Sequence, residues 1–239
     1  MKAHRLPWAA ALAVLFTAQL LTADVLDKTK SIAGTTVHYK VILPPGYDAA
    51  KAYPGILAFG GGSQTMQIVE GTITRFWHAQ AEQRGYIVIL PAAPDGRLFF
   101  EGGERIFPEF LDKILADYKI QDNKFHATGM SNGGISAFHV AASHPKYFWS
   151  ITVFPGYLPE ATPARVSAIS KMCVNMYVGE LDTGWLEDMQ HQASQLKAKG
   201  MTVHFAVEKG QGHVPATLAN DGAKRLFDHF DQARQGCAK

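Results

Sequence analysis

The fold of this chain is decided by residues 124–134, which read KFHATGMSNGG. We expect a short apolar strand, a tight turn and a helix in that order. Gly129 and Gly133 stand two positions before and two positions after Ser131, where a Cβ would collide because strand and helix pass close to each other. Such a turn exposes the serine hydroxyl at the end of the strand, which is the shape of a nucleophile elbow.

A second interpretation of the same stretch needs no chemistry. The chain has 22 glycines in 239 residues, so a serine between glycines can arise by chance. Serine is also among the best residues to cap the N-terminus of a helix, and Ser131 would then only begin a helix after a flexible turn. The motif therefore counts only together with its strand, its helix and matched residues elsewhere in the chain.

Length and composition indicate a globular protein of one large or two small domains. Hydrophobic residues make up 47% of the chain and charged residues 18%, which excludes a disordered chain. The formal net charge is +2 and no basic block is present, so nucleic acids are not expected as partners. No linker, repeat or low-complexity segment divides the chain, and we expect a single domain over residues 24–239.

Residues 1–23 have the organisation of a secretory signal peptide. Lys2 and Arg5 precede an apolar run that ends at Leu21, and Ala23 is a small residue suited to cleavage. An uncleaved membrane anchor is the alternative, but a proline and a glutamine shorten the apolar core below the ~20 residues that span a bilayer. We expect a secreted or periplasmic protein without stable membrane association after cleavage, with basic and acidic side chains equal in number.

Two cysteines, Cys173 and Cys237, remain in the mature chain. In an oxidising compartment such a pair is a candidate disulfide that would fasten the C-terminal end to the body of the protein. Two unpaired thiols are the alternative, with Cys173 as a small apolar residue of a strand. The spacing of the cysteines gives no indication of a metal site.

Strands and helices alternate along the chain. Strands are expected at residues 36–43, 55–59, 86–90, 124–128, 150–154, 172–178 and 201–207, and helices at 69–84, 107–118, 132–143, 186–199 and 215–234. Continuously apolar strands indicate a sheet that is covered on both faces. The pattern predicts an α/β protein with one doubly wound, mostly parallel sheet and no lid domain.

Ser131, Asp182 and His213 each follow a predicted strand. Ligands of an open parallel sheet bind beyond the carboxyl ends of its strands, so these three residues are expected at one edge. A serine hydroxyl needs a base within hydrogen-bond reach to become a nucleophile, and histidine is such a base near neutral pH. A carboxylate on the far ring nitrogen fixes the tautomer and stabilises the imidazolium. The sequence predicts a catalytic nucleophile, base and acid.

Other residues compete for two of these roles. Glu180 lies nearer the end of its strand than Asp182, and Asp188 is expected on the solvated face of the following helix. His126 lies inside a predicted strand and His139 well inside a predicted helix, so neither histidine is expected to reach the sheet edge.

Negative charge that develops on an ester carbonyl oxygen requires N–H donors. The N–H of Asn132, directly after the serine, is one expected donor. The other is expected from Gly61 or Gly62 in the loop at residues 60–63, because glycine lets the backbone turn its amides inward. A plain flexible loop is the alternative for the three consecutive glycines.

These residues together resemble a known group of enzymes. The matching stretches are 39–48 (YKVILPPGYD), Tyr53-Pro54, the glycine loop, 129–134 and the loops of Asp182 and His213. They are similar to lidless secreted α/β-hydrolase esterases, namely the feruloyl and acetylxylan esterases of carbohydrate esterase family 1 and polyhydroxybutyrate depolymerase-like esterases. The resemblance covers about residues 35–230. It implies an α/β-hydrolase fold and a serine esterase, without metal or cofactor, that acts on a small-molecule or polymer-borne ester.

One position departs from this resemblance. Such enzymes usually have a structural histidine where the glycine loop begins, and Phe59 stands there instead, which leaves the conformation of the loop open. Aromatic residues on predicted edge loops are candidates for substrate binding, with a capping role over the core as the alternative. These residues are Phe99, Phe100, Phe154, Tyr157 and Trp185.

Two other functions stay open at this point. Serine peptidases of the prolyl-oligopeptidase type share the turn and the residue order, but normally carry an additional propeller domain. A non-catalytic binding protein with the same fold is the other alternative. The sequence does not choose between feruloyl, acetyl and hydroxyalkanoate esters.

Overall fold

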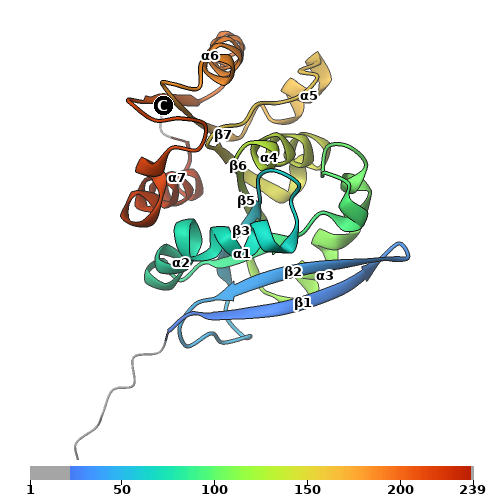
Figure 1. The fold of residues 1–239 in the computed structure, drawn as a ribbon. Coiled ribbons are helices and arrows are strands. Elements are labelled where there is room, and N and C mark those ends of the chain that lie inside the picture. The colour runs from blue at the N-terminus through green and yellow to red at the C-terminus, as the bar shows by residue number, and fades with distance from the viewer. Residues whose placement is uncertain (1–21, 238–239) are drawn as a thin grey trace, which may run out of the picture.

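A computed structural model describes residues 22–237 of the chain (Figure 1). Its centre is an eight-stranded sheet in the order β1-β2-β4-β3-β5-β6-β7-β8, which is open, with β1 and β8 at its edges. The β1–β2 and β2–β4 pairs are antiparallel, and all other pairs are parallel. The predicted doubly wound, mostly parallel sheet is confirmed.

The elements have the following bounds. The strands are β1 Asp24–Ile32, β2 Thr35–Leu43, β3 Tyr53–Phe59, β4 Ile87–Pro91, β5 Ile120–Gly129, β6 Phe148–Val153, β7 Cys173–Gly179 and β8 Val203–Glu208. The helices are α1 Met66–Thr72, α2 His78–Arg84, α3 Glu109–Asp117, α4 Asn132–Ser143, α5 Pro163–Ala168, α6 Thr183–Ala198 and α7 Lys224–Arg234. Short 3-10 or π-helical turns are η1 Ile73–Trp77, η2 Pro94–Gly96, η3 Gly103–Ile106, η4 Pro145–Tyr147, η5 Ala216–Leu218 and η6 Asn220–Ala223.

Helices cover both faces of the sheet. Side chains of α3, α4 and α6 form one apolar cluster with the sheet, and side chains of α1, α2 and α7 form a second cluster on the opposite face. Neighbouring strand residues alternate between the two: Leu57 of β3 belongs to the first and Ile56 to the second. Full burial of each such side chain stabilises the fold by roughly 1.5–3 kcal/mol, which explains why apolar residues predominate in the central strands.

β1 is a strand that the sequence pattern does not predict. It contains Asp24, Asp27, Lys28 and Lys30, and most of its side chains are exposed or half-buried. Charged side chains are common on edge strands because they discourage pairing with another chain. Lys40 of β2 forms an ion pair with Asp27, which ties the edge strand down.

The helix expected over residues 69–84 is interrupted. α1 ends at Thr72, a π-helical turn follows, and α2 begins at His78. Thr72 donates a hydrogen bond from its hydroxyl to the carbonyl of Val69 (2.7 Å) and accepts one from the indole N–H of the buried Trp77 (3.1 Å). Such side-chain bonds compete with the regular helix. The last helix also begins later than expected, at Lys224, because two 3-10 turns precede it.

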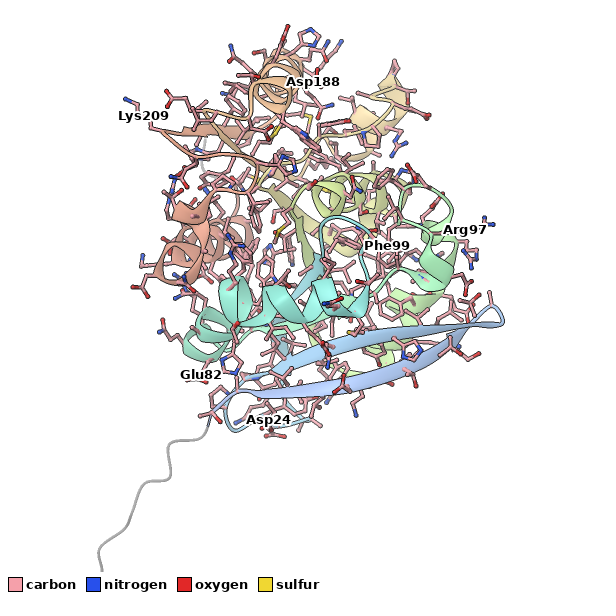
Figure 2. The ribbon with its side chains drawn as sticks, viewed as in Figure 1. Asp24, Glu82, Arg97, Phe99, Asp188 and Lys209 are labelled. Atoms are coloured by element: carbon pink, nitrogen blue, oxygen red, sulfur yellow. A yellow bond between two sulfur atoms is a disulfide. The ribbon has the colours of Figure 1, made fainter. Side chains whose placement is uncertain are left out.

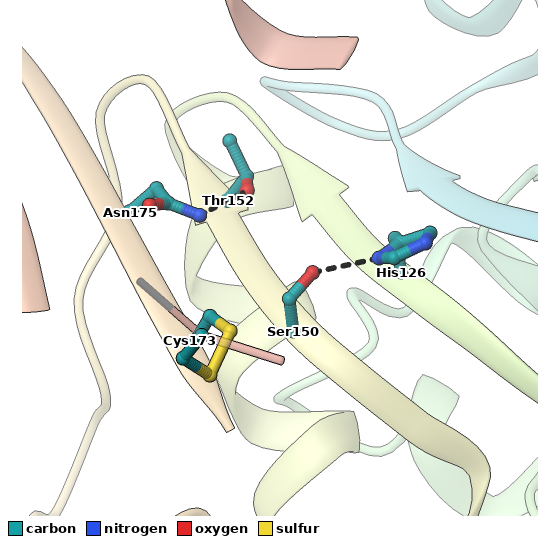
Figure 3. Close-up of a disulfide and its surroundings, with 6 residues drawn as sticks. His126, Ser150, Thr152, Cys173 and Asn175 are labelled. Atoms are coloured by element: carbon teal, nitrogen blue, oxygen red, sulfur yellow. Dashed lines mark hydrogen bonds between the residues drawn. A yellow bond between two sulfur atoms is a disulfide. The ribbon is translucent and has the colours of Figure 1, made fainter. Parts of the chain in front are cut away.

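A disulfide joins Cys173, the first residue of β7, to Cys237 beyond α7 (Figure 3). The two Cα atoms are 5.4 Å apart across a sequence separation of 64 residues. Closing a loop of this length stabilises a fold by about 4 kcal/mol in the chain-entropy account. Of the two alternatives open from the sequence, the disulfide is the one that the structure contains.

Residues 1–21 of the predicted signal peptide lie outside the described residues. Between residues 22 and 237, no helix has both the length and the apolar composition needed to cross a bilayer.

His126 is a fully buried histidine between β6 and α7. Its Nδ1 lies 2.8 Å from the Ser150 hydroxyl (Figure 3). Its ring stacks on Phe230 of α7 at a centroid distance of 5.1 Å. Burial, and to a smaller degree the charge of Arg234, lowers the pKa of His126 to about 3. The residue is therefore part of the core, as its place inside a predicted strand suggested.

We predict that acid destabilises the fold through His126. The folded protein keeps this imidazole neutral down to about pH 3, whereas the unfolded chain takes up a proton below the ordinary pKa of 6.5. Because the unfolded state binds the extra proton, the free energy of unfolding should fall by about 1.4 kcal/mol per pH unit below that value.

Urea unfolding of the wild type and His126→Phe at about pH 7 and about pH 5 measures this contribution. From pH 7 to pH 5, the free energy of unfolding should fall by about 2 kcal/mol less in the variant than in the wild type. His191→Gln, at an exposed position of α6, is the control and should keep the wild-type pH dependence. An equal pH dependence in His126→Phe would contradict the prediction.

Candidate active site

Ser131 has backbone angles that few residues with a side chain adopt. Its φ is 55° and its ψ is −125°, between the end of β5 and the first residue of α4. The N–H of Ser131 donates to the carbonyl of Pro155 (2.8 Å), and its own carbonyl accepts from the N–H of Ile135 (3.0 Å). Strained residues of this kind persist only where the surroundings fix them, and they are frequent at functional sites.

The two glycines that flank the turn are required by close backbone contacts. A Cβ at Gly133 would lie 2.3 Å from the carbonyl oxygen of Phe59 and 2.5 Å from that of Gly60. A Cβ at Gly129 would lie 2.4 Å from the carbonyl carbon of Gly133. The strand and helix approach each other as closely as the sequence suggested, and this approach holds Ser131 at the end of the strand.

The structure brings the three predicted residues Ser131, His213 and Asp182 together. Nε2 of His213 lies 2.8 Å from the Ser131 hydroxyl oxygen, and Nδ1 of His213 lies 2.7 Å from Oδ2 of Asp182. Ser131 follows the end of β5, Asp182 the end of β7 and His213 the end of β8. When Nδ1 carries the hydrogen and donates it to Asp182, Nε2 is free to accept the serine proton.

The position of Asp182 explains why its carboxylate is available. It occupies the N-cap of α6, where an aspartate usually accepts hydrogen bonds from the first helical N–H groups, yet its side chain makes no such bond. The Asp182 side chain is 16% exposed and that of His213 41% exposed, so the pair opens to solvent on the histidine side.

The competing residues have other partners. Glu180 accepts a hydrogen bond from the N–H of Gly210 (2.9 Å), and Asp188 is exposed on α6 (Figure 2). His126 is in the core, and Nδ1 of His139 lies 3.0 Å from the Arg165 guanidinium. The structure places none of them in the Ser131 cluster.

The glycine loop lies against the serine turn. A Cβ on Gly61 would be 3.2 Å from the carbonyl oxygen of Met130 and 3.7 Å from Cβ of Ser131. Gly62 has a φ of +51°, and its carbonyl accepts a hydrogen bond from the Asn132 side chain (2.9 Å). Asn132 is the first residue of α4, where backbone N–H groups have no helical partner. The loop and the helix start are adjacent, and the donor roles of Gly61, Gly62 and Asn132 stay predictions.

Gln64 holds the glycine loop, and sequence reasoning missed it. The residue is fully buried with a φ of 53°. Its amide donates to the Ser136 hydroxyl of α4 (2.8 Å), and its side-chain oxygen accepts from the N–H of Phe99 (3.1 Å). Its backbone carbonyl accepts from the N–H of Ala93 (2.8 Å). A polar residue two positions after a glycine run was the available signal, but its partners are distant in the sequence.

Phe59 fills the position where the resembling enzymes have a histidine. It is 1% exposed, and its ring contacts those of Phe99 (5.1 Å) and Phe107 (6.3 Å) between centroids. In this chain, aromatic packing replaces the histidine at the start of the loop, and Gln64 supplies the polar anchor five residues later.

Residues 22–237 contain no group of three or more His, Cys, Asp or Glu side chains suited to hold a metal ion. The site itself offers one hydroxyl, one imidazole, one carboxylate and backbone N–H groups. This donor set can activate a hydroxyl and hold an oxyanion.

Several solved structures resemble this chain over most of its length. The feruloyl esterase module of Clostridium thermocellum, solved with sinapinate, has a TM-score of 0.65 at 17% identity, over 84% of this chain and 87% of that one. A thermostable esterase has a TM-score of 0.68 at 16% identity, over 86% and 63% of the two chains. S-formylglutathione hydrolase of Agrobacterium tumefaciens has a TM-score of 0.64 at 15% identity, over 90% and 95%.

The chain has the α/β-hydrolase fold. At identities of 15–17% the likeness shows the fold alone. The three neighbours named here are two esterases and one hydrolase.

Sequence comparison finds two curated relatives of this chain, both named dipeptidyl-peptidase 5. The Porphyromonas gingivalis protein is 31% identical over an alignment of 170 residues, and the match covers 58% of this chain and 24% of the relative. The Porphyromonas endodontalis protein is 34% identical over an alignment of 125 residues, and the match covers 45% of this chain and 17% of the relative. The chain therefore spans about a quarter or less of these relatives. No protein-family model matches the chain.

The substrate-binding role predicted for Phe99 and Phe154 is wrong. Phe99 and Phe154 have no exposed surface. Phe99 packs on Phe59, and Phe154 packs on Phe76 (5.1 Å) and Trp77 (6.1 Å between centroids). Both side chains turn into the core because their loops fold back over it, which is the capping role that the sequence left open.

Tyr157 and Trp185 do lie beside the site. Both are half-buried, and their ring centroids are 5.2 Å apart. The Trp185 ring meets the imidazole of His213 edge-on at 5.1 Å. Phe100 is half-buried on the loop that follows Phe99. The aromatic pair therefore borders the predicted base.

We predict that Gly133→Ala disrupts the turn at Ser131. The added methyl group would meet two backbone carbonyl oxygens that cannot move without displacing β3 or the glycine loop. A loss of about 3 kcal/mol or more in unfolding free energy is expected, since forced overpacking of this kind is among the costly substitutions.

Urea unfolding tests this, with Gly71→Ala as the matched control. Gly71 lies in α1, and a Cβ there has no atom within 4 Å. The control should be neutral or more stable by about 0.5–1 kcal/mol. Wild-type stability of Gly133→Ala would contradict the close approach of strand and helix.

We also predict that Gln64→Met lowers kcat while the protein stays folded. Methionine has a similar length but cannot hold Ser136 and the N–H of Phe99, so the glycine loop loses its anchor. A roughly 10- to 100-fold lower kcat on any turned-over ester is expected, below the 10²–10³ cost of removing an oxyanion donor outright. Gln80→Met, at a buried glutamine of α2 that bonds to Gln83 and Arg84, should leave kcat unchanged. Equal kcat in both variants would contradict the anchoring role.

Proposed function

We propose that this chain hydrolyses carboxylic esters through an acyl-enzyme on Ser131. The observation that carries the proposal is the pair of short contacts on His213, 2.8 Å to the Ser131 hydroxyl and 2.7 Å to Asp182. A strained serine at a strand end, a base within hydrogen-bond reach and a carboxylate behind the base form the arrangement that activates a serine nucleophile.

In the first half of the reaction, the Ser131 oxygen attacks the ester carbonyl carbon and its proton passes to Nε2 of His213. Asp182 holds the Nδ1–H and balances the positive charge of the imidazolium. The N–H groups of Asn132 and of Gly61 or Gly62 would stabilise the oxyanion, each by about 3–4 kcal/mol. Collapse of the intermediate breaks the bond to the alcohol, which leaves with the proton from His213.

In the second half, water attacks the acyl group on Ser131 while His213 takes a proton from it. The carboxylic acid then leaves and the serine recovers its proton. The sum of both halves is one ester and one water converted to one alcohol and one acid.

The aromatic pair Tyr157 and Trp185 is the proposed contact surface for the substrate. It borders His213, so a group attached to the scissile bond would lie near these rings. The partner is a small-molecule or polymer-borne ester, and the low net charge argues against nucleic acid.

Export to a secreted or periplasmic location belongs to the same proposal. The leader-like residues 1–23 support it, and so does the Cys173–Cys237 disulfide, because disulfides persist in oxidising compartments.

Peptide hydrolysis is the second candidate, because the curated relatives are named dipeptidyl-peptidase 5. We prefer ester hydrolysis because the sequence match spans 24% or less of those peptidases. In contrast, the feruloyl esterase module and S-formylglutathione hydrolase are matched over 87% and 95% of their own chains.

A substrate panel tests the proposal. The purified protein should turn over one or more of p-nitrophenyl acetate, p-nitrophenyl butyrate, methyl ferulate and a hydroxybutyrate oligomer, faster than dipeptide p-nitroanilides. Ser131→Ala should lower kcat by roughly a thousandfold or more. Ser194→Ala, at an exposed serine of α6, should keep wild-type kcat. Unchanged ester hydrolysis in Ser131→Ala, or a preference for the dipeptide substrates, would overturn the proposal.

A further inference from the structure

One buried carboxylate, that of Glu208, joins the two ends of the loop that carries His213. Glu208 is the last residue of β8, and its side chain is 9% exposed. Its Oε2 accepts a hydrogen bond from the hydroxyl of Thr217, which lies beyond His213 in the chain (2.6 Å). Arg225 of α7 donates to both carboxylate oxygens, at 2.7 and 2.9 Å. The carboxylate thus closes the segment 208–217 into a ring held against α7.

The backbone joins this segment to the loop of Asp182. The carbonyl of Glu208 accepts the N–H of Glu180 (3.0 Å), and the carbonyl of Gln211 accepts the N–H of Leu181 (2.9 Å). These bonds flank Asp182 on its N-terminal side. The acid loop and the base loop therefore form one hydrogen-bonded unit.

The contact between the two loops leaves no free space. A Cβ at Gly179 would lie 2.0 Å from the carbonyl oxygen of Gly212, the residue before His213. The side-chain oxygen of Gln211 accepts the N–H of Ala216 (2.9 Å), which closes the base loop a second time. A shift of Glu208 would therefore move the backbone on which His213 stands.

Charge fixes the carboxylate in this position. The hydrogen bonds from Arg225 hold the pKa of Glu208 below its ordinary value of 4.5, with Thr217 contributing in the same direction. The Arg225 guanidinium also lies over the ring of Tyr177, 5.0 Å from its centroid. The ion pair therefore joins β8, which carries Glu208, to α7, which carries Arg225.

We propose that the Glu208–Arg225 ion pair positions His213 between Ser131 and Asp182. The kinetic part of this inference rests on the proposed function. The imidazole must keep two contacts of 2.7 and 2.8 Å at once, and a displacement of about 1 Å at such a site costs about a hundredfold in rate. Glu208 and Arg225 touch no reacting atom and act through the loop.

A second ion cluster on α7 provides the control. Arg84 of α2 donates to Asp228 (2.7 Å) and Asp231 (2.6 Å), and its side chain is 18% exposed. This cluster also fixes α7, but it joins the helix to α2 and has no bond to the loop of His213. Arg84→Gln should lower stability without moving the base.

Kinetics of Glu208→Gln, Arg225→Gln and Arg84→Gln on the best ester of the panel test the inference. The first two should lower kcat roughly 10- to 100-fold with KM changed less than about threefold, because the base is displaced while the substrate surface stays. Arg84→Gln should keep the wild-type kcat. If Glu208→Gln does not fold, Thr217→Val takes its place, with a lower kcat expected, and Thr217→Ser should restore it by returning the hydroxyl.

The downfield ¹H NMR signal of the Nδ1 proton of His213 provides a readout that needs no turnover. Glu208→Gln or Thr217→Val should shift or broaden this signal, and Arg84→Gln should keep it. An unchanged signal with unchanged kcat in Glu208→Gln would overturn the inference, as would an equal loss of kcat in Arg84→Gln. If the wild type hydrolyses no ester but the signal responds as stated, the proposed function fails and the positioning role stands.

Discussion

The close approach of β5 and α4 at Ser131 is the constraint on which the site depends. Without side chains at Gly129 and Gly133, the start of the helix reaches the carbonyl oxygens of Phe59 and Gly60. The serine between them has a φ of 55° and a ψ of −125°, a backbone conformation that residues with a side chain rarely adopt. One steric requirement thereby presents the hydroxyl, brings the glycine loop beside it and leaves the N–H of Asn132 next to the same point.

The site adds two loops to this turn, and each is held by a buried polar side chain. Gln64 joins the glycine loop to α4, and Glu208 joins the loop of His213 to α7. Neither residue touches a reacting atom, and the hydrogen bonds of each join a site loop to a neighbouring helix. Buried polar groups are costly unless fully bonded, so they specify one loop arrangement more strongly than apolar packing would.

Much of the fold could be predicted because the central strands are buried on both faces and are therefore mainly apolar. β1 was not predicted because its charged residues, which suit an edge strand, leave no continuous apolar run in its sequence. The interruption after α1 arises from a contact between Thr72 and Trp77 that a 3.6-residue repeat does not reveal. Likewise, the spacing of two cysteines says nothing about the 5.4 Å between their Cα atoms.

For the site, the sequence predicted which residues lie at the ends of strands. It did not predict the direction in which their side chains point. Ser131, Asp182 and His213 could be named because parallel strands end at one edge. Phe99 and Phe154 were misplaced because a loop residue can turn inward as readily as outward, and both turn into the core. Gln64 and Glu208 were missed because their partners lie on other loops and helices, and no sequence repeat or motif links them.

Mass spectrometry of the protein after reaction with a fluorophosphonate probe tests the central claim, that Ser131 is a nucleophile activated by His213. The account predicts a single adduct, located on the peptide that contains Ser131, with much slower labelling of His213→Gln. The absence of an adduct, or an adduct on another serine, would contradict it.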